Sequence, residues 1–270
     1  MKVKSVLLTE MRGSVSKPVF KDRQTFKTYR DKGIILEKKP EFKKGWSRKQ
    51  RLHRHNYMIW RLIWAQMTDE EREAYREEAD KKKITPYNEY LHQKMTIPQK
   101  RVFFEYTNDP FEFFPRRVYC NGQLVSVGIE PDWRIRTYLK PYWGIIPFDI
   151  SISKAELWLK VYEARDGYYV GTEIYCYKVL EDWNCKSLNW DNQPTVSDTA
   201  TDTAICPDND QWFSFDVTAD IQDLISNKKE PFGWQLRGPE EDPPTDVYYV
   251  DLYGQWHYRD RPYLLLYVED

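Results

Sequence analysis

Residues 101–270 contain short runs in which apolar and polar residues alternate, separated by turn-forming residues. Alternation with a period of two is typical of strands that bury one face. The pattern predicts ten strands, at residues 101–106, 116–120, 123–127, 134–139, 154–162, 172–180, 211–217, 232–237, 247–252 and 262–268. Ten short strands with no long helix between them predict a mainly β fold, here a jelly-roll-like β-sandwich.

The segment 183–194, WNCKSLNWDNQP, is the most distinctive stretch of this half. Its apolar and aromatic positions alternate until a cluster of turn formers, DNQP, ends the run. We expect Trp183 and Trp190 to lie in the core and the DNQP turn to leave the strand. The strand that follows, WFSFDVT, leads into Thr218, which we expect to cap a short helix over residues 219–225.

Between residues 47 and 95 the apolar spacing changes to that of amphipathic helices. Ser47 and Thr68 open capping boxes, and Thr85 is an N-cap residue followed by proline. These signals predict helices over 47–65, 68–82 and 85–95. The helices are predicted to form a small three-helix unit, built around Trp60, Trp64, Tyr75, Tyr87, Tyr90 and Leu91.

Residues 1–46 are basic and poorly periodic. Apolar runs at 19–20, 25–29 and 34–36 are candidate short strands, and the sequence DKG between the last two predicts one weak hairpin. An extended arm of this kind buries little by itself, so we expect it to order only against something else. With a short linker, the predicted parts of the chain are an arm at 1–46, a three-helix unit at 47–95, a linker at 96–100 and a β-sandwich at 101–270.

Charge is distributed very unevenly, although the net charge of the chain is only −1. Residues 1–100 hold 25 Lys and Arg against 13 Asp and Glu, a net charge of +12, and residues 101–270 carry −13. The basic half could meet nucleic acid, an acidic protein surface or the acidic half of a neighbouring copy, and a solvated Lys-rich face is the alternative. The candidate docking residues of the arm are Lys17, Lys21, Arg23, Lys27, Arg30, Lys38, Lys39, Lys43, Lys44 and Arg48.

Aromatic residues make up 16% of the chain, including 11 Trp and 20 Tyr. Flat rings in loops can stack on sugar faces or anchor a protein interface. Adjacent aromatics in a strand point to opposite faces, so we expect about half of such rings to be core. The candidate glycan or protein contacts are Tyr142, Trp143, Tyr168, Tyr248, Trp256 and Tyr258.

The four cysteines match no zinc pattern, because no CxxC is present. We expect buried free thiols, with a disulfide such as Cys185–Cys206 as the alternative. The N-terminal apolar run at 6–8 is too short for a signal-peptide core, so we expect no export by that route. No apolar run is long enough to span a membrane, and no membrane partner is predicted.

No catalytic, phosphate-binding or dinucleotide-binding motif is present, so the sequence predicts a non-enzyme with no cofactor or metal site. Surface or satisfied core positions are expected for the four histidines. A glycosidase-like acid pair among Asp191, Asp216 and Asp251 is an alternative. The acidic segments 202–210 and 239–246 could hold calcium, and solvated loops are the other explanation.

The run MTDEEREAYREEADKKKITPYNEYL is similar to a cassette of uncharacterised phage and archaeal-virus structural proteins. Those proteins combine a basic N-terminal stretch, a W-x-x-L-T-x-x-x-R type turn and a T-G-Y-N-x-F type segment. Here the turn begins at Trp64, and the second segment reads TPYNEY, with Pro86 where glycine is usual. The helical part of this run also looks like the last part of an HMG box. Residues 69–80 are strongly acidic, which disfavours DNA bending.

The β half resembles the DNRLRE-type β-sandwich family, which is related to repeats of archaeal disaggregatase and to some carbohydrate-binding modules. Six segments agree in order and spacing: RIRTYL, AELWL, WNCKSLNWDNQP, WFSFDVT, GWQL and RPYL. The resemblance implies a β-sandwich and makes Asp216 a structural residue at a strand-to-helix corner. Residues 251–259 lack the family's Ser-Arg-Glu pattern, so no site is carried over there.

Three hypotheses about function follow. The first is a non-catalytic structural protein of a virus particle, capsid-associated, decorating or spike-like. It would form homo-oligomers and dock on other virion or assembly proteins through its basic arm. The second is a carbohydrate-binding or adhesion module of an extracellular surface protein that holds polysaccharide. The third is nucleic-acid binding by the basic half, which predicts salt-dependent retention.

Overall fold

A computed structural model of the 270-residue protein describes residues 2–3, 24–29, 33–38, 46–110, 112, 116–118, 120–130, 133–164, 170–229, 232–239, 248–255 and 259–269. The chain divides into two compact units, Met1–Trp46 and Ser47–Asp270.

The first unit contains a three-stranded antiparallel sheet in the order β1-β3-β2, formed by β1 (Lys2–Val3), β2 (Gln24–Tyr29) and β3 (Gly33–Lys38). Strands β2 and β3 pair from Tyr29 opposite Gly33 to Gln24 opposite Lys38. This confirms the hairpin that the DKG turn predicts. The apolar run at 19–20 lies outside the described residues.

The second unit begins with α2 (Arg48–Gln66), α3 (Asp69–Glu73), α4 (Arg76–Lys82) and α5 (Pro86–Thr96). The capping boxes at Ser47 and Thr68 and the N-cap at Thr85 are all present, because these are local signals that need no distant partner. The helix predicted over 68–82 is wrong in one respect, since it is divided at Tyr75. The Tyr75 ring lies edge-on to Tyr90, with centroids 5.2 Å apart.

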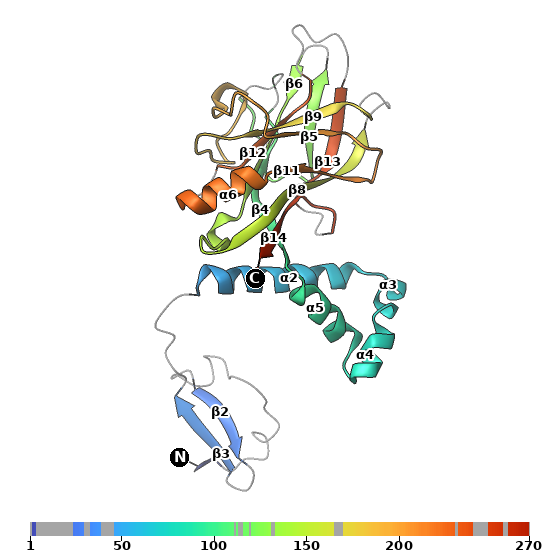
Figure 1. The fold of residues 1–270 in the computed structure, drawn as a ribbon, viewed down its shortest axis with the longest axis vertical. Helices are drawn as coiled ribbons and strands as arrows, with labels where there is room; N and C mark the ends of the chain where they lie inside the picture. Colours follow the sequence, from blue (N-terminus) through green and yellow to red (C-terminus); the bar gives the residue numbers. More distant parts are fainter. Residues whose placement is uncertain are drawn as a thin grey trace. The chain divides into compact units, whose positions relative to one another are not determined.

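In the part of this segment that the structure describes, eleven strands follow: β4 (Gln99–Asn108), β5 (Leu124–Glu130), β6 (Trp133–Ile135), β7 (Thr137–Pro141), β8 (Ser151–Ala164), β9 (Glu173–Lys178), β10 (Asp202–Ile205), β11 (Trp212–Asp216), β12 (Trp234–Arg237), β13 (Tyr248–Tyr253) and β14 (Tyr263–Glu269). They are antiparallel, in the order β10-β9-β12-β7-β4-β14-β8-β13-β5-β6, with β11 paired to β8. Between strands, the described residues include the 3-10 helices η1 (Trp143–Ile145) and η3 (Trp190–Asn192) and the α-helix α6 (Thr218–Asn227). The mainly β fold predicted from the sequence is confirmed, and the arrangement is that of a β-sandwich (Figure 1).

Strand β4 belongs to both parts of this sandwich. Its first half, to Phe103, pairs with β14, and its second half, from Phe104, pairs with β7. The register shifts between Phe104 and Tyr106, as is usual where a strand bends from one sheet into the other. The predicted linker 96–100 contributes the last residue of α5 and the first residues of β4.

Alternation along β8 explains how both faces of this sheet are used. Leu157, Leu159 and Val161 are fully buried in the main core, while Trp158 and Lys160 between them point to the opposite face. The helices pack against that opposite face, and a second core there joins Trp60 and Tyr90 to residues of β4 and β14. Figure 1 shows β14 ending beside α2. The division of residues 47–270 into a helical domain and a β domain stays a prediction.

Several strand predictions need correction. The predicted strand at 116–120 is absent from its described residues, where Cys120 makes only an isolated bridge to Asn108. The strand predicted at 134–139 is two strands, β6 and β7, which separate at Arg136. Strand β10 was not predicted, because Asp202–Ile205 lies at an edge and has no buried residue.

The segment 183–194 forms turns and η3 instead of a strand. Trp183 is buried as expected, and its Nε1 donates to the carbonyl oxygen of Phe232 at 2.7 Å. Trp190 is only half-buried, so its predicted core position is wrong. Thr218 is the first residue of α6 and not its cap. Asp216 accepts its N–H at 2.9 Å, in agreement with a structural role for that carboxylate.

Cys120 and Cys185 form a disulfide, with Cα atoms 5.3 Å apart. Buried free thiols are correct for Cys176 and Cys206 and wrong for the other two. The alternative Cys185–Cys206 pairing is also wrong. The backbone N–H of Cys206 donates to the carbonyl oxygen of Thr172, just before β9 begins, whereas Cys185 follows the opposite end of that strand. The two cysteines therefore lie at different ends of β9.

Candidate functional site

A groove of about 410 Å³ lies between the helices and the outer face of the sheet. Three strands supply an aromatic wall, with Trp158 from β8, Trp212 from β11 and Tyr263 from β14. The remaining lining residues come from the helices, from β4 and from the segment before β14: Trp60, Ile63, Met67, Tyr75, Tyr90, Lys94, Arg101, Arg259 and Asp260.

Strand register brings the rings of the aromatic wall together. Tyr263 is paired directly with Trp158, and their rings stack with centroids 6.4 Å apart and planes 10° apart. Trp212 lies across this pair, at 67° to Trp158 and 60° to Tyr263. Tyr263 is only 7% exposed, while both tryptophans are half-buried. The ring surfaces open to a ligand are therefore mainly those of Trp158 and Trp212.

The helical wall is held by aromatic packing. Tyr90 is fully buried, and its ring centroid lies 6.5 Å from that of Trp60 and 5.2 Å from that of Trp64. Ile63 and Met67, which are partly buried, add apolar surface to this side. Asn56 of α2 ties the wall to the sheet, because its Oδ1 accepts the backbone N–H of Arg101 at 2.8 Å.

Arg101 carries the positive charge at the base of the groove. Its guanidinium lies 4.7 Å from the Trp60 ring centroid and 4.2 Å from that of Tyr263, so it is stacked between two aromatic rings. Burial lowers the pKa of Arg101 and raises the pKa of Tyr263. No carboxylate within the described ranges forms a salt bridge with Arg101. Lys94 adds a second cation, 5.7 Å from the Trp60 centroid.

One lining residue of the groove, Arg259, belongs to an ion pair. Arg259 donates to Oε1 of Glu71 in α3, and Oε2 of the same carboxylate accepts the N–H of Thr68 at 2.9 Å. The capping hydrogen bond from Thr68, followed by the contact with Arg259, lowers the pKa of Glu71. Asp260 next to it accepts from Nζ of Lys160 at 3.1 Å. The groove thus combines accessible rings with charged groups at its rim and base.

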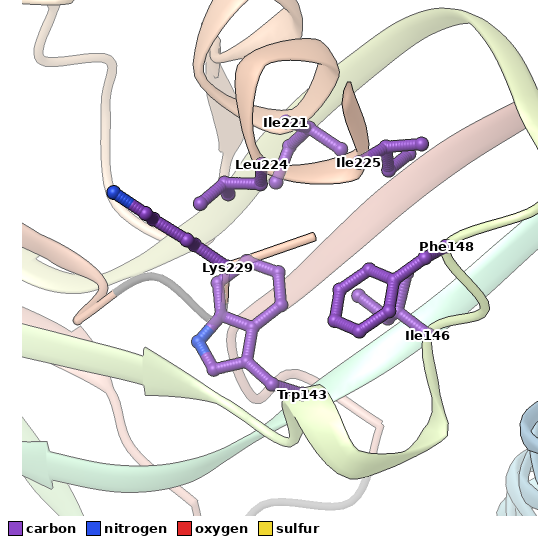
Figure 2. A pocket seen from close by; sticks show the side chains of 7 residues that line it. All are labelled: Trp143, Ile146, Phe148, Ile221, Leu224, Ile225 and Lys229. Carbon is purple, nitrogen blue, oxygen red and sulfur yellow. The ribbon is translucent and has the colours of Figure 1, made fainter. Parts of the chain in front are cut away.

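A second cavity is small and apolar (Figure 2). In Figure 2 the rings of Trp143 and Phe148 face Ile221, Leu224 and Ile225 of α6 across it. Its volume is about 10 Å³, which is the space of a single water molecule. Trp143 is 6% exposed here, so its predicted role as a surface contact is wrong. The reason is that α6, far along the chain, covers it.

A third hollow, of about 320 Å³, lies on the loop before β10 and is lined by Glu181, Asp182, Trp183, Asn184, Ser187, Leu188, Asn192 and Pro194. Its two carboxylates already have partners, one within the loop and one on β7. Thr195 Oγ1 donates to Glu181 Oε1 at 2.8 Å, and Lys140 Nζ donates to Asp182 at 2.6 Å. Trp183 is only 7% exposed, so this hollow offers little ring surface.

The other predicted contact residues do not line the groove within the part of the chain that the structure describes. Tyr142 is 43% exposed and follows β7, outside the groove. Tyr248 lies in β13, and its side chain is outside the described part. Tyr168, Trp256 and Tyr258 are outside the described residues. For Tyr142 and these four residues a contact role stays a prediction.

Most of the predicted docking arm also lies outside the described residues: Lys17, Lys21, Arg23, Arg30, Lys39, Lys43 and Lys44. Lys27 is in β2 and Lys38 in β3. Arg48, in the first turn of α2, donates to the carbonyl oxygen of Ile146 at 3.2 Å and stacks over Phe148 at 4.1 Å. Arg48 thus makes contacts inside its own unit, and docking by the arm stays a prediction.

The three acids considered for a glycosidase-like pair each have a separate partner. Asp191 lies in η3 with Arg116 at 3.8 Å, Asp216 accepts the N–H of Thr218, and Asp251 accepts from Ser126 Oγ at 2.7 Å. Within the described ranges no three His, Cys, Asp or Glu side chains gather where a metal ion could be held. Calcium at 202–210 or 239–246 stays a prediction, and most of the second segment lies outside the described residues.

His55 agrees with the expectation of a satisfied core histidine. It is half-buried, and its Nε2 accepts the backbone N–H of Phe103 at 3.3 Å. Burial, followed by the nearby charge of Arg261, lowers its pKa to about 4. None of the helices in the described part is long and apolar enough to cross a membrane.

Trp158 and Trp212 are not among the site residues expected from the sequence. A signal was available for Trp158, since it stands between Leu157 and Leu159 and therefore points away from the core. A tryptophan at a position that faces away from the core indicates that something other than water covers the outer face of the sheet. The sequence does not predict that the helices cover that face, because they lie more than sixty residues earlier in the chain.

Comparison with known proteins points to one family. None of the curated proteins compared matches the chain. The DNRLRE-type resemblance is not confirmed, and neither the fold nor the comparison supports a virion role. Residues 118–251 match the model of carbohydrate-binding module family 96. This match indicates that the chain contains a β-rich domain of carbohydrate-binding type.

Proposed function

We propose that this protein binds carbohydrate through the groove between its helices and its sheet, as a binding module without catalytic activity. The observation that carries the proposal is the position of Trp158 and Trp212. Both lie inside the region that matches the carbohydrate-binding family, and both present ring surface to the groove. Tryptophan on the outer face of a sheet is otherwise unfavourable, because it leaves apolar area in water.

The groove offers the two kinds of contact that a sugar needs. A pyranose ring has an apolar face of C–H groups, which can lie against an aromatic ring, and a rim of hydroxyl groups, which need hydrogen-bond partners. Trp158 and Trp212 supply the rings. Arg101, Lys94 and Asp260 supply donors and an acceptor at the base and rim. The excess of positive charge favours glycans that carry carboxylate or sulfate groups.

We propose a location outside the cytoplasm, at a cell surface or in the extracellular space. The Cys120–Cys185 disulfide supports this, since such bonds persist mainly in oxidising compartments. The match to a carbohydrate-binding family supports it as well. Homo-oligomer formation stays a prediction that sedimentation can test. Nucleic-acid binding by the basic half also stays a prediction, and salt-dependent retention on DNA can test it.

The test is a glycan array of neutral and acidic glycans probed with the full chain, followed by calorimetry on the glycans retained. We expect saturable binding that weakens about tenfold or more in each of Trp158→Ala and Trp212→Ala. Tyr57→Ala is the matched control, because Tyr57 is 44% exposed on α2 and does not line the groove. Circular dichroism should show all three variants folded. Absence of binding to every glycan, or equal affinity in the tryptophan variants, would contradict the proposal.

A further inference from the structure

The groove has two walls, and only one of them lies in the region that matches the carbohydrate-binding family. Trp158 and Trp212 lie within residues 118–251, whereas Ile63 and Met67 of the opposite wall precede it. We propose that the helices complete the binding site, so that the groove encloses one short glycan chain instead of lying on a flat polysaccharide surface. This inference rests on the proposed function and concerns which form of carbohydrate the same site takes.

The first argument is the angle between the accessible rings. Two tryptophans that bind a flat, ordered polysaccharide surface must present their faces in one plane. The planes of Trp158 and Trp212 are 67° apart, and their centroids lie 6.5 Å from each other. Both rings therefore cannot lie against one flat surface. They can contact two sides of a single chain, or two successive sugar rings that are turned relative to each other.

The second argument is size. A volume of about 410 Å³ lies in the lower part of the range for small-ligand sites, roughly 300–1,000 Å³. A groove of this size between two walls admits a narrow ligand and not the broad face of an insoluble particle. A few sugar rings fit this space, and further units of a longer chain would extend into solvent.

The third argument is that the helical wall is fixed before any ligand arrives. Trp60 and Tyr90 share a core with Phe103 and Tyr263 of the sheet, so the helices cannot move without exposing buried rings. The ion pair of Arg259 with Glu71 and the hydrogen bond from Arg101 to Asn56 add two polar ties. A wall that is already in place reduces the entropy lost on binding and makes the width of the groove a determinant of specificity.

The experiment fills the groove from the helical side. In Met67→Trp the new ring occupies the space beside the helical wall, while Met58→Trp is the matched control. Met58 is 45% exposed on α2 and does not line the groove. Affinities are measured by calorimetry on β-glucan, β-mannan, β-xylan and pectic oligosaccharides of increasing length, and retention is measured on microcrystalline cellulose. Met67→Phe and Ile63→Phe serve as smaller replacements if Met67→Trp does not fold.

We expect affinity to rise over the first few sugar units and then stay constant, with no retention on cellulose. Met67→Trp should weaken binding about tenfold or more and Met58→Trp should not change it. If Met67→Trp binds as well as the unmodified protein while Trp158→Ala does not bind, the helical wall is not part of the site and the proposed function stands. Binding only to the insoluble surface likewise overturns the inference alone. If the unmodified protein binds no soluble or insoluble carbohydrate, both the inference and the proposed function fail.

Discussion

Removing the Cys120–Cys185 disulfide should lower the stability of the second unit substantially. The bond joins residues 65 positions apart, between the segment after β4 and the turn that follows β9. A cross-link limits the conformations of the unfolded chain, and for a loop of this length the loop-entropy relation corresponds to about 4 kcal/mol at 25 °C. In a unit of this size the midpoint of thermal unfolding should fall by roughly 10 °C.

The measurement is urea unfolding of the unmodified protein and of the Cys120→Ala/Cys185→Ala variant, each with and without reductant. The unmodified protein should lose stability when reductant is present during unfolding, and the double variant should show no further change. Cys176→Ala is the matched control. Cys176 is buried and has a free thiol, so its removal leaves a cavity but preserves the response to reductant.

A loss below about 1 kcal/mol with an unchanged denaturant slope would refute the entropic reasoning, because it would mean that the unfolded chain is not restricted by the bond. Mass spectrometry of the alkylated, digested protein provides a separate check. A bond from Cys185 to any cysteine other than Cys120 would show that the pairing itself is different.

Three further outcomes are expected. Gly233→Ala should destabilise the protein by at least about 2 kcal/mol in thermal unfolding, because φ is +97° and a Cβ would collide with a backbone oxygen of β7, whereas Gly144→Ala meets open space and should be neutral. Asn56→Ala should cost about 2 kcal/mol in urea unfolding by leaving the backbone N–H of Arg101 without its acceptor, and Asn56→Asp should cost at least as much, because it buries a carboxylate against the carbonyl oxygen of Leu52 to which the amide donates at 3.0 Å. His55 has a folded-state pKa of about 4 against 6.5 when unfolded, so the unfolded chain takes up its proton first as the pH falls. Stability should therefore decline between about pH 6.5 and pH 4, by up to about 3 kcal/mol, and denaturant titrations should find this decline smaller in His55→Gln.

Local signals in the sequence predicted local structure well. The capping boxes at Ser47 and Thr68 and the proline after Thr85 each mark a helix start within a residue, since their partners lie three positions away. The period-two pattern likewise found most strands of the sandwich. Strand β10 was not predicted, because an edge strand with no buried residue lacks the alternation of apolar and polar residues that indicates a strand.

Features that depend on distant partners were not predictable. Trp143 and Tyr142 are adjacent and equally aromatic, yet one is covered by α6 and the other is 43% exposed. Four cysteines allow three complete pairings, and only the fold brings Cys120 beside Cys185. The groove itself requires helices and strands that are far apart in sequence, so neither of its walls identifies it alone.

The position of β4 and β14 sets the boundaries within which this protein can be divided. The segment that matches the carbohydrate-binding family, 118–251, omits both strands. Without β4 the hydrogen-bonding edge of β7 loses its partner, and without β14 the edge of β8 does as well. Each bare edge is a template for pairing with another chain. The stretch that matches the family is therefore shorter than the stretch in which these two edges are paired, which reaches from β4 to β14.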